Sequence, residues 1–238
     1  MNIYINYLVA FVSLLAIESN GVPRFANYFQ DHMVLQRAPQ RAVIWGYGDQ
    51  SRVTHLSINN QSYTTISNSQ ADNAAGESIW SVTLDPVSDE GPFDINVTQP
   101  SSQGNVTITL HDVLFGDVWL CSGQSNMVLT VNLIYNGSIE IANAGKYPKI
   151  RLFTAESIPS AIALDELEHI TQNWSVASPE SVNGSQWAYF SAVCWLYGRM
   201  IHQALDNRPI GLMVGAYVGT AIEVWMPPEA LKDCNATQ

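Results

Sequence analysis

The chain has 238 residues, of which 47% are hydrophobic, so it can bury a sizeable core in one large domain or two small ones. Its formal net charge is −11, which argues against nucleic acid as a partner because phosphates carry the same sign. The sequence contains no His-x-x-x-His, no Cys-x-x-Cys, no repeated acidic loop and no glycine-rich phosphate cradle. It therefore predicts neither a metal site nor a cofactor.

Residues 1–21 are expected to form a secretory signal peptide. The apolar run at 7–17 is too short to span a membrane comfortably, and residues 19–21 offer small side chains for cleavage. No later apolar run is long enough to span, so we expect no stable membrane insertion.

Asn-x-Ser/Thr sequons recur along the chain and favour passage through the secretory pathway. An extracellular or lysosomal location is expected, and nothing in the sequence separates the two. The glycosylation candidates are Asn60, Asn96, Asn105, Asn136, Asn173, Asn183 and Asn235.

Residues 22–111 have the pattern of a β-sandwich domain. Short runs rich in β-branched and aromatic residues alternate with polar, glycine and proline clusters. At 106–110 apolar and polar residues alternate, as expected for a strand with one buried face. The predicted strands cover residues 42–47, 53–58, 63–66, 79–84, 93–98 and 106–111.

At residue 112 strands begin to alternate with helices, which indicates a second, α/β domain over 112–238. The predicted elements are a buried strand at 113–121, a helix from Ser125 to residue 133, a strand at 150–153, a polar loop at 156–186, a helix at 191–205 and a strand at 210–217. This order implies right-handed crossovers and a parallel sheet. Ligands of such sheets bind at the carboxyl ends of the strands, where Ser125 and Gly219 both lie.

The helix at 191–205 is predicted to be amphipathic, with one apolar stripe facing the core. Cys194 is placed on its apolar face and His202 on its polar side. The stripe consists of Val193, Leu196, Tyr197, Met200, Ile201 and Leu205.

Ser125 is the candidate nucleophile. A serine at a strand-to-helix turn sits on a rigid scaffold, near helix N–H groups that can stabilise an oxyanion. The residues around Ser125 do not follow the Gly-x-Ser-x-Gly pattern, because position 127 is Met. The sequence therefore does not predict the nucleophile elbow of the α/β-hydrolases. The alternative interpretation is that Ser125 is a helix N-cap, which is the commoner role for serine at such a position.

Several blocks, in the same order, resemble the sialate O-acetylesterases, which are SGNH-type serine esterases that remove acetyl groups from sialic-acid hydroxyls. The most specific block joins Gly116-Asp117-Val118-Trp119 to Gly123-Gln124-Ser125-Asn126-Met127. The other matching blocks are residues 25–28, 32–36, 42–48, 191–199, 209–212 and 219–225. The resemblance covers nearly the whole chain after the signal segment and implies a β-sandwich followed by an incomplete SGNH-like α/β domain.

The resemblance also implies a mechanism and roles for single residues. Ser125 would attack the acetyl carbonyl and form an acetyl-enzyme, which water then hydrolyses without a cofactor. The N–H groups of Ser125 and of the turn at Gly219 and Thr220 would hold the oxyanion, with Asn126 as a further donor or as an ordinary first-turn residue. The expected substrate is an O-acetylated sialic acid or a related acetylated sugar. The residues expected to support the loops are Gln124 and Glu223.

Two departures from the family's pattern bear on activity. The family reads Trp-Gly-Gly-Thr where this chain has Tyr217-Val218-Gly219-Thr220, and a β-branched residue restricts the backbone where glycine would not. The family's Asp-x-x-His block, which supplies the catalytic base, lies nearer the C-terminus of a considerably longer chain and has no counterpart here. We therefore expect the chain to be the N-terminal part of an esterase. The rival hypothesis is a non-catalytic carbohydrate-binding or vestigial protein.

The cysteines and histidines have mainly structural interpretations. Cys121 and Cys194 are expected to be buried apolar residues rather than bridge partners, and Cys234 is expected to pair beyond residue 238. His32 and His111 adjoin acids, but strand neighbours point to opposite faces, so neither adjacent pair is expected to form a catalytic dyad. The histidines at 55, 169 and 202 show no catalytic pattern.

Overall fold

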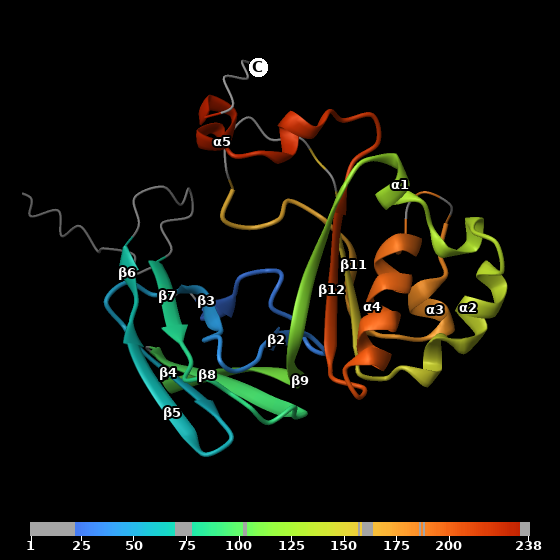
Figure 1. Ribbon diagram of the computed structural model, residues 1–238. Coiled ribbons are helices and arrows are strands. Elements are labelled where there is room, and N and C mark those ends of the chain that lie inside the picture. Colours follow the sequence, from blue (N-terminus) through green and yellow to red (C-terminus); the bar gives the residue numbers. More distant parts are fainter. Residues whose placement is uncertain are drawn as a thin grey trace, which may run out of the picture.

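The computed structural model describes residues 22–69, 78–101, 104–156, 158, 164–185, 187 and 189–233. This part of the chain is dominated by two sheets, with most of the helices gathered at one side (Figure 1). The predicted signal peptide at 1–21, Cys234 and the sequon at Asn235 lie outside the described residues. Among the described helices, none is long and apolar enough to cross a membrane.

The N-terminal half consists mainly of short strands that pair antiparallel, whereas β2 pairs parallel with the long strand β9. One sheet has the order β1-β3-β7-β6, and the other begins β5-β4-β8-β9. Each of the six predicted strands is present, whereas β1, β2 and β6 are too short to show a sequence pattern. The bounds are β1 (Arg24–Phe25), β2 (Val34–Gln36), β3 (Val43–Gly48), β4 (Val53–Ile58), β5 (Gln61–Ile66), β6 (Asn68–Ser69), β7 (Ser78–Thr83), β8 (Phe93–Ser101) and β9 (Gly104–Gly123).

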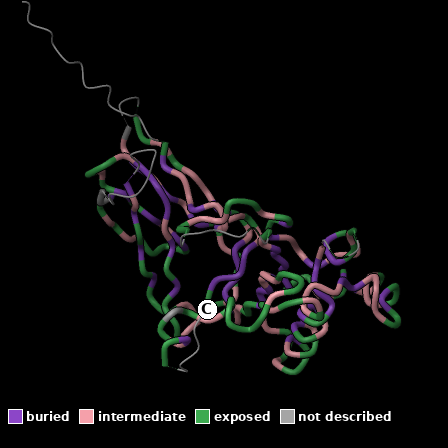
Figure 2. The backbone as a smooth tube through the Cα atoms, turned by 90° about the horizontal axis from the view of Figure 1, so that it is seen from above, coloured by how far each residue is buried: buried purple, intermediate pink, exposed green. Residues whose placement is uncertain are grey.

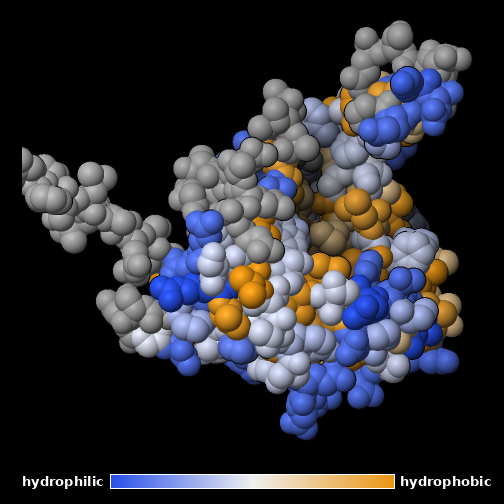
Figure 3. All heavy atoms as spheres, turned by 90° about the vertical axis from the view of Figure 1, so that its left-hand side faces the viewer, coloured by the Kyte–Doolittle hydropathy of each residue, from blue (hydrophilic) through white to orange (hydrophobic). Residues whose placement is uncertain are grey.

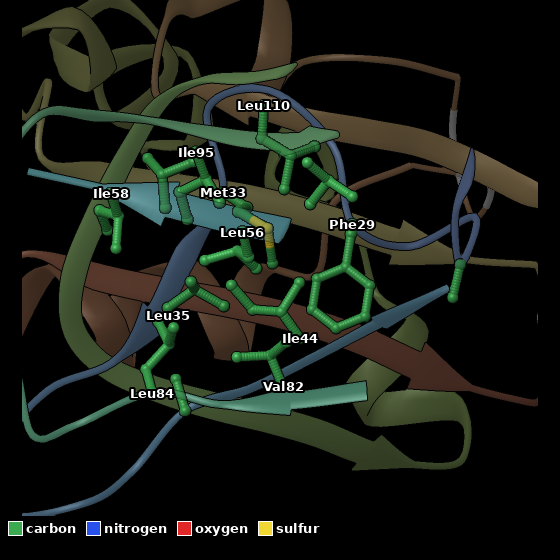
Figure 4. Close-up of a cluster of buried hydrophobic side chains, with 14 of the residues drawn as sticks. Phe29, Met33, Leu35, Ile44, Leu56, Ile58, Val82, Leu84, Ile95 and Leu110 are labelled. Carbon is green, nitrogen blue, oxygen red and sulfur yellow. The ribbon is translucent and has the colours of Figure 1, made fainter. Parts of the chain in front are cut away.

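The two sheets share one hydrophobic core (Figure 4). Ile44 and Val82 come from the first sheet, Leu56 and Ile95 from the second, and Phe29 from the segment between β1 and β2. Buried and exposed residues alternate along β4 and β7, so each strand contributes one face to this core.

β9 is a strand of 20 residues that runs through the predicted domain boundary at residue 112. It pairs antiparallel with β8 up to Val113, and then parallel with β12 (Ile210–Ala216) from Asp117 to Gly123. Near the change of partner, Asp112 has a positive φ of 54° and the pairing with β8 shifts register, as in a bulge that bends a strand. β9 thereby extends the second sheet into the C-terminal half.

The C-terminal part of this sheet has the order β11-β10-β12-β9. β10 (Ile150–Ala155), β12 and β9 are parallel, as predicted, whereas β11 (Ile170–Val176) is antiparallel to β10. β11 lies within 156–186, so the prediction of a loop there was wrong. The alternation of apolar and polar residues that marks a strand is interrupted here, because the inward-facing position 172 is a glutamine. Gln172 is nevertheless buried, since its side-chain amide donates to the Ser181 carbonyl (2.8 Å).

Helices cover one face of the parallel strands, and the N-terminal core packs against the other (Figure 1). Leu152 and Leu212 point to the helices, while Phe153 and Trp174 join the core between the sheets. Buried residues concentrate along the strands, and the loops are largely exposed (Figure 2). The helices are α1 (Ser125–Val128), η1 (Val131–Leu133), α2 (Gly137–Asn143), η2 (Ala144–Lys146), α3 (Pro179–Val182), α4 (Ala192–Ala204), η3 (Ile222–Trp225) and α5 (Pro228–Asp233).

The predicted helix at 191–205 is present as α4, but the prediction of its buried face was wrong. Trp195 and Gly198 face the sheet, and a Cβ at Gly198 would lie 2.4 Å from Leu212 Cδ1, so the backbone approaches too closely for a larger residue. His202 is also buried, with Nδ1 2.7 Å from the Arg208 carbonyl oxygen. Much of the predicted stripe is exposed instead, including 63% of Met200.

Cys121 and Cys194 form a disulfide bond, which corrects the expectation that they do not pair. The bond connects the end of β9 to the first turn of α4, between positions 73 residues apart. The pairing could not be read from an odd number of cysteines so far apart in sequence.

Candidate functional site

The strand-to-helix turn at Ser125 is present, with a different cap from the one predicted. β9 ends at Gly123 (φ 144°) and α1 begins at Ser125. The N-cap is Gln124, whose Oε1 accepts from the Ser125 backbone N–H (3.2 Å) and from Ser125 Oγ (2.8 Å). Ser125 is therefore the first helical residue, and the N-cap alternative was wrong.

α1 is shorter than the predicted helix because the chain leaves it to contact the start of α4. Leu129 ends the helix, and its carbonyl accepts from the Ala192 N–H (2.8 Å). Thr130 then forms an isolated antiparallel bridge with Ser191, which caps α4. The position of Ser125 is thus fixed by β9 on one side and by α4 on the other.

The turn that follows β12 lies beside the Ser125 turn. The Tyr217 N–H donates to the Gly123 carbonyl (2.9 Å), so the carboxyl ends of β9 and β12 are joined. Gly219 has a φ of 78°, a left-handed conformation that favours glycine. Thr220 Oγ1 donates to the Tyr217 carbonyl and accepts from Trp225 Nε1, both at 2.9 Å.

Asn126 and Glu223 are both exposed at this edge of the sheet. Among the described residues, no hydrogen-bond partner is found for the Asn126 backbone N–H or for the Glu223 carboxylate. Glu223 lies in η3, which contacts the end of β9. Asn126 can therefore donate to a ligand without losing a protein contact, whereas a loop-supporting role for Glu223 stays a prediction.

A cavity of about 520 Å³ opens at the carboxyl ends of β10 and β12. Val128 of α1 lines it, which places it next to the Ser125 turn. Most of the wall is apolar, and Glu156 and Thr154 add polar groups. Val218, where the family's pattern has glycine, contributes to the wall as well.

None of the five histidines lies beside Ser125. His169 reaches the same edge of the sheet, because Ile170 pairs with Ala155 at the end of β10. β11 is three strand spacings from β9, so roughly 14 Å of sheet separates His169 from the Ser125 turn. His55 is on β4, and His202 is buried at the far end of α4.

His32 and His111 pair with acids that are not their sequence neighbours. His32 Nδ1 lies 2.7 Å from Asp112 Oδ2, and His111 Nδ1 lies 3.1 Å from Asp94 Oδ2. Buried Arg151 also donates to both Asp112 oxygens, at 2.6 and 3.2 Å. Since Arg151 is at the start of β10, this cluster lies toward the opposite edge of the sheet from Ser125.

The pKa of Asp112 lies below its ordinary value. Burial acts to raise it, but hydrogen bonds and charges from Arg151 and His32 outweigh burial and stabilise the carboxylate. Replacing Asp112 with Asn is therefore expected to destabilise the fold by about 1–2 kcal/mol at neutral pH, since buried Arg151 loses a counter-charge that is itself partly exposed. Asparagine tolerates the positive φ of this position, so the loss reports the charge.

The sign of the pH dependence follows from the lowered pKa. The stabilisation is fully present above the unfolded pKa of about 4 and disappears as pH falls through the folded pKa. Urea unfolding should give the Asp112→Asn variant a clearly lower free energy of unfolding than the unaltered protein at neutral pH. This difference should narrow toward about pH 2.5. A gap of equal size at both pH values would contradict this account.

Comparison with known proteins gives the family context of this site. No family model matches the chain. It is 40% identical to the sialate O-acetylesterase of Mus musculus over 212 residues, which cover 89% of this chain and 39% of that protein. It is 39% identical to the Homo sapiens protein of the same name over 229 residues, which cover 96% of this chain and 43% of the human protein. The chain is a homologue of these sialate O-acetylesterases over most of its own length.

The predicted resemblance is thus confirmed, and the chain spans about two fifths of the length of these relatives. Its structure is similar to the crystal structure of a carbohydrate acetylesterase from Xanthomonas citri. The TM-score is 0.74 at 27% identity, over 89% of this chain and 44% of that one. The mixed parallel and antiparallel architecture is therefore shared with a carbohydrate acetylesterase.

Proposed function

We propose that this protein is a carbohydrate esterase in which Ser125 is the nucleophile and O-acetylated sialic acid is the substrate. The observation that carries the proposal is the placement of Ser125 on the turn between β9 and α1, beside a cavity, in a homologue of the sialate O-acetylesterases. This edge of the sheet, at the carboxyl ends of parallel strands, is where such folds bind ligands.

In the proposed reaction, Ser125 Oγ attacks the acetyl carbonyl and its proton passes to a histidine oriented by an aspartate. N–H groups of Ser125, Asn126 and the Gly219 turn stabilise the oxyanion, after which the sugar hydroxyl leaves and water hydrolyses the acetyl-enzyme. Gln124 has to release Ser125, because its Oε1 now accepts from both the backbone N–H and the hydroxyl. The base would come from a part of the esterase fold without a counterpart in this chain.

The cavity suits an acetylated sugar in size and composition. Its volume of about 520 Å³ lies in the usual range for small-ligand sites. Val128, Val214 and Ala216 provide an apolar wall for the acetyl methyl group. Thr154 and Glu156 offer hydrogen-bonding groups for sugar hydroxyls.

Several features support processing in the secretory pathway, which we propose as the route to an extracellular or lysosomal location. The Cys121–Cys194 disulfide is typical of oxidising compartments. Five sequon asparagines are exposed and Asn96 is partly exposed, so a glycan could be accommodated at each. The exposed ones are Asn60, Asn105, Asn136, Asn173 and Asn183.

We further propose that residues 22–111 form a β-sandwich domain and residues 112–238 the first part of an SGNH-like domain. The common core of the two N-terminal sheets supports the first assignment. The parallel β10-β12-β9 arrangement with helices on one face supports the second.

The rival proposal is a carbohydrate-binding protein without catalysis. Its specific support is that no histidine among the described residues lies beside Ser125. The Ser125 hydroxyl instead donates a hydrogen bond to Gln124. The discriminating experiment expresses the complete open reading frame in a secretory host. Acetate release is then measured from a set of sialic acids O-acetylated at different hydroxyls and from 4-nitrophenyl acetate. The esterase proposal predicts release from both, whereas saturable binding of the sugar without release would support the rival.

Val218 is expected to affect the preference for the substrate rather than the chemical step. Its φ is not positive, so the valine is accommodated without backbone strain, and its side chain narrows the cavity. Val218→Ala should raise kcat/KM for the acetylated sugar by about two- to tenfold, the scale of one or two methyl groups in a pocket. Hydrolysis of the small 4-nitrophenyl acetate should stay nearly constant.

Val224→Ala is the matched control, because Val224 is similarly exposed (58% against 53%) and does not line the cavity. An equal gain in the two variants would refute the assigned role of Val218.

A further inference from the structure

One large aromatic side chain, that of Trp187, is exposed in the wall of the cavity beside Ser125. It is 50% exposed and belongs to neither hydrophobic core. Exposed hydrophobic side chains also occur elsewhere, and Figure 3 shows several around a hollow on the side of the molecule that is on the left in Figure 1. Exposure alone therefore does not mark a ligand site, and three further features single out Trp187.

The backbone of Trp187 is strained. Its φ is 61°, in the left-handed region that glycine and asparagine enter readily, whereas a bulky residue there is an outlier. Such a conformation persists only where the surrounding structure fixes it, and conformations of this kind cluster at active sites and ligand clamps. The fold therefore holds a tryptophan at this point of the cavity wall at a cost in stability.

Hydrogen bonds fix Trp187 to the segment that directly follows α1. The Trp187 N–H donates to Thr130 Oγ1 (3.4 Å), and buried Thr130 donates in turn to Asn132 Oδ1 (2.7 Å). Asn132 Nδ2 donates to the Gly184 carbonyl (3.0 Å), which holds the chain again three residues before Trp187. Since α1 begins at Ser125, the indole and the proposed nucleophile are positioned by the same continuous segment.

The indole ring of Trp187 is available to a ligand. Among the described residues, no aromatic ring packs against it, and no hydrogen-bond partner is found for its Nε1–H group. By contrast, Trp119 is in edge-to-face contact with Tyr197, and Trp225 Nε1 donates to Thr220. Trp187 therefore offers a π face and a hydrogen-bond donor that no described side chain occupies.

A sugar ring matches these groups chemically. A pyranose carries hydroxyl groups around its rim and C–H groups on its faces, and the hydrogens of these C–H groups have a partial positive charge. The face of an aromatic ring is the negative part of its quadrupole, so it attracts such hydrogens. Thr154 and Glu156, at the end of β10, line the same cavity and can bond the hydroxyls. The cavity thus combines a stacking surface with polar contacts, as ligand sites commonly do.

We infer that Trp187 binds the sugar ring of the acetylated substrate by stacking on it, and so determines which acetyl esters are preferred. The inference rests on the proposed function and adds the group that recognises the sugar rather than the acetyl group. An ester without a ring, such as ethyl acetate, gains nothing from the indole. Comparison of the two kinds of ester therefore separates recognition of the sugar from the chemical step.

Trp187→Ala is tested in the protein expressed from the complete open reading frame. It should lower kcat/KM for O-acetylated sialic acids by about tenfold or more, the scale of a tryptophan anchor in a binding site. Hydrolysis of ethyl acetate should stay constant. Trp187→Phe keeps an aromatic face and should recover most of the loss.

Affinity for the sugar is measured separately from catalysis, by isothermal titration calorimetry of the same sialic acids with Ser125→Ala. Adding Trp187→Ala to that variant should weaken binding by about tenfold or more. Tyr135→Ala is the matched control, because Tyr135 is an aromatic residue that is 92% exposed and does not line the cavity. It should leave the affinity and kcat/KM unchanged.

An unchanged affinity in Trp187→Ala, an equal loss in Tyr135→Ala, or no sugar binding by Ser125→Ala would each overturn the inference. An equal loss for ethyl acetate and the sugar would do so too, because the indole would then support the site without contacting the sugar. Binding that requires Trp187, in a protein that releases no acetate, would support the inference and contradict only the proposed esterase activity.

Discussion

Ser125→Ala is expected to lower kcat for acetyl-ester hydrolysis by about 10⁴-fold or more, because no acetyl-enzyme can form without the hydroxyl. The variant is made in the protein expressed from the complete open reading frame and assayed for acetate release. Folding should be unaffected. Ser125 Oγ is hydrogen-bonded only to Gln124 among the described residues, and alanine is compatible with the first turn of α1.

Ser122→Ala is the matched control for this variant. Ser122 is an exposed serine three positions earlier, at the end of β9, and should tolerate the change with full activity. Substantial activity in Ser125→Ala, or an equal loss in Ser122→Ala, would remove Ser125 from the reaction.

Loss of the Cys121–Cys194 bridge is expected to have the largest effect on stability. The closed loop spans 73 residues, for which chain entropy gives a stabilisation of about 4 kcal/mol relative to the open chain. Replacing both cysteines with alanine should lower the urea midpoint by a corresponding amount and reduce the secreted yield. Since the bond holds the first turn of α4 against the end of β9, esterase activity should fall before the whole chain unfolds.

Val193→Ala is the matched control, because Val193 is an exposed residue next to Cys194 in the first turn of α4 and its replacement leaves the Cys121–Cys194 bond intact. Its stability should stay within about 0.5 kcal/mol of that of the unaltered protein. An unchanged urea midpoint in the double variant would show that the bond does not contribute to the stability of the fold.

Local patterns in the sequence were sufficient to predict most strands and the turn that carries Ser125. β4 has the predicted bounds because its alternation of buried and exposed residues is regular. The order of strands and helices likewise predicted the parallel pairing of β9, β10 and β12. Where local propensity and tertiary packing agree, a single sequence is enough.

The errors arose where distant residues decide the outcome. The face of α4 is set by the close approach of Gly198 to Leu212 and by a disulfide across 73 residues, neither of which is visible in helical periodicity. β11 was not predicted because a buried position in it is occupied by Gln172, a polar residue whose side chain donates to the Ser181 carbonyl. At the site, the capping role of Gln124 depends on a side-chain rotamer that spacing does not reveal.

The most direct test of the central claim is to locate the covalent adduct formed with a fluorophosphonate, by mass spectrometry of the protein expressed from the complete open reading frame. An activated serine nucleophile reacts selectively under native conditions, so one adduct is expected on the peptide containing Ser125, and none after denaturation or in Ser125→Ala. Acetyl-ester hydrolysis accompanied by an adduct on another residue, or by none at all, would contradict the account.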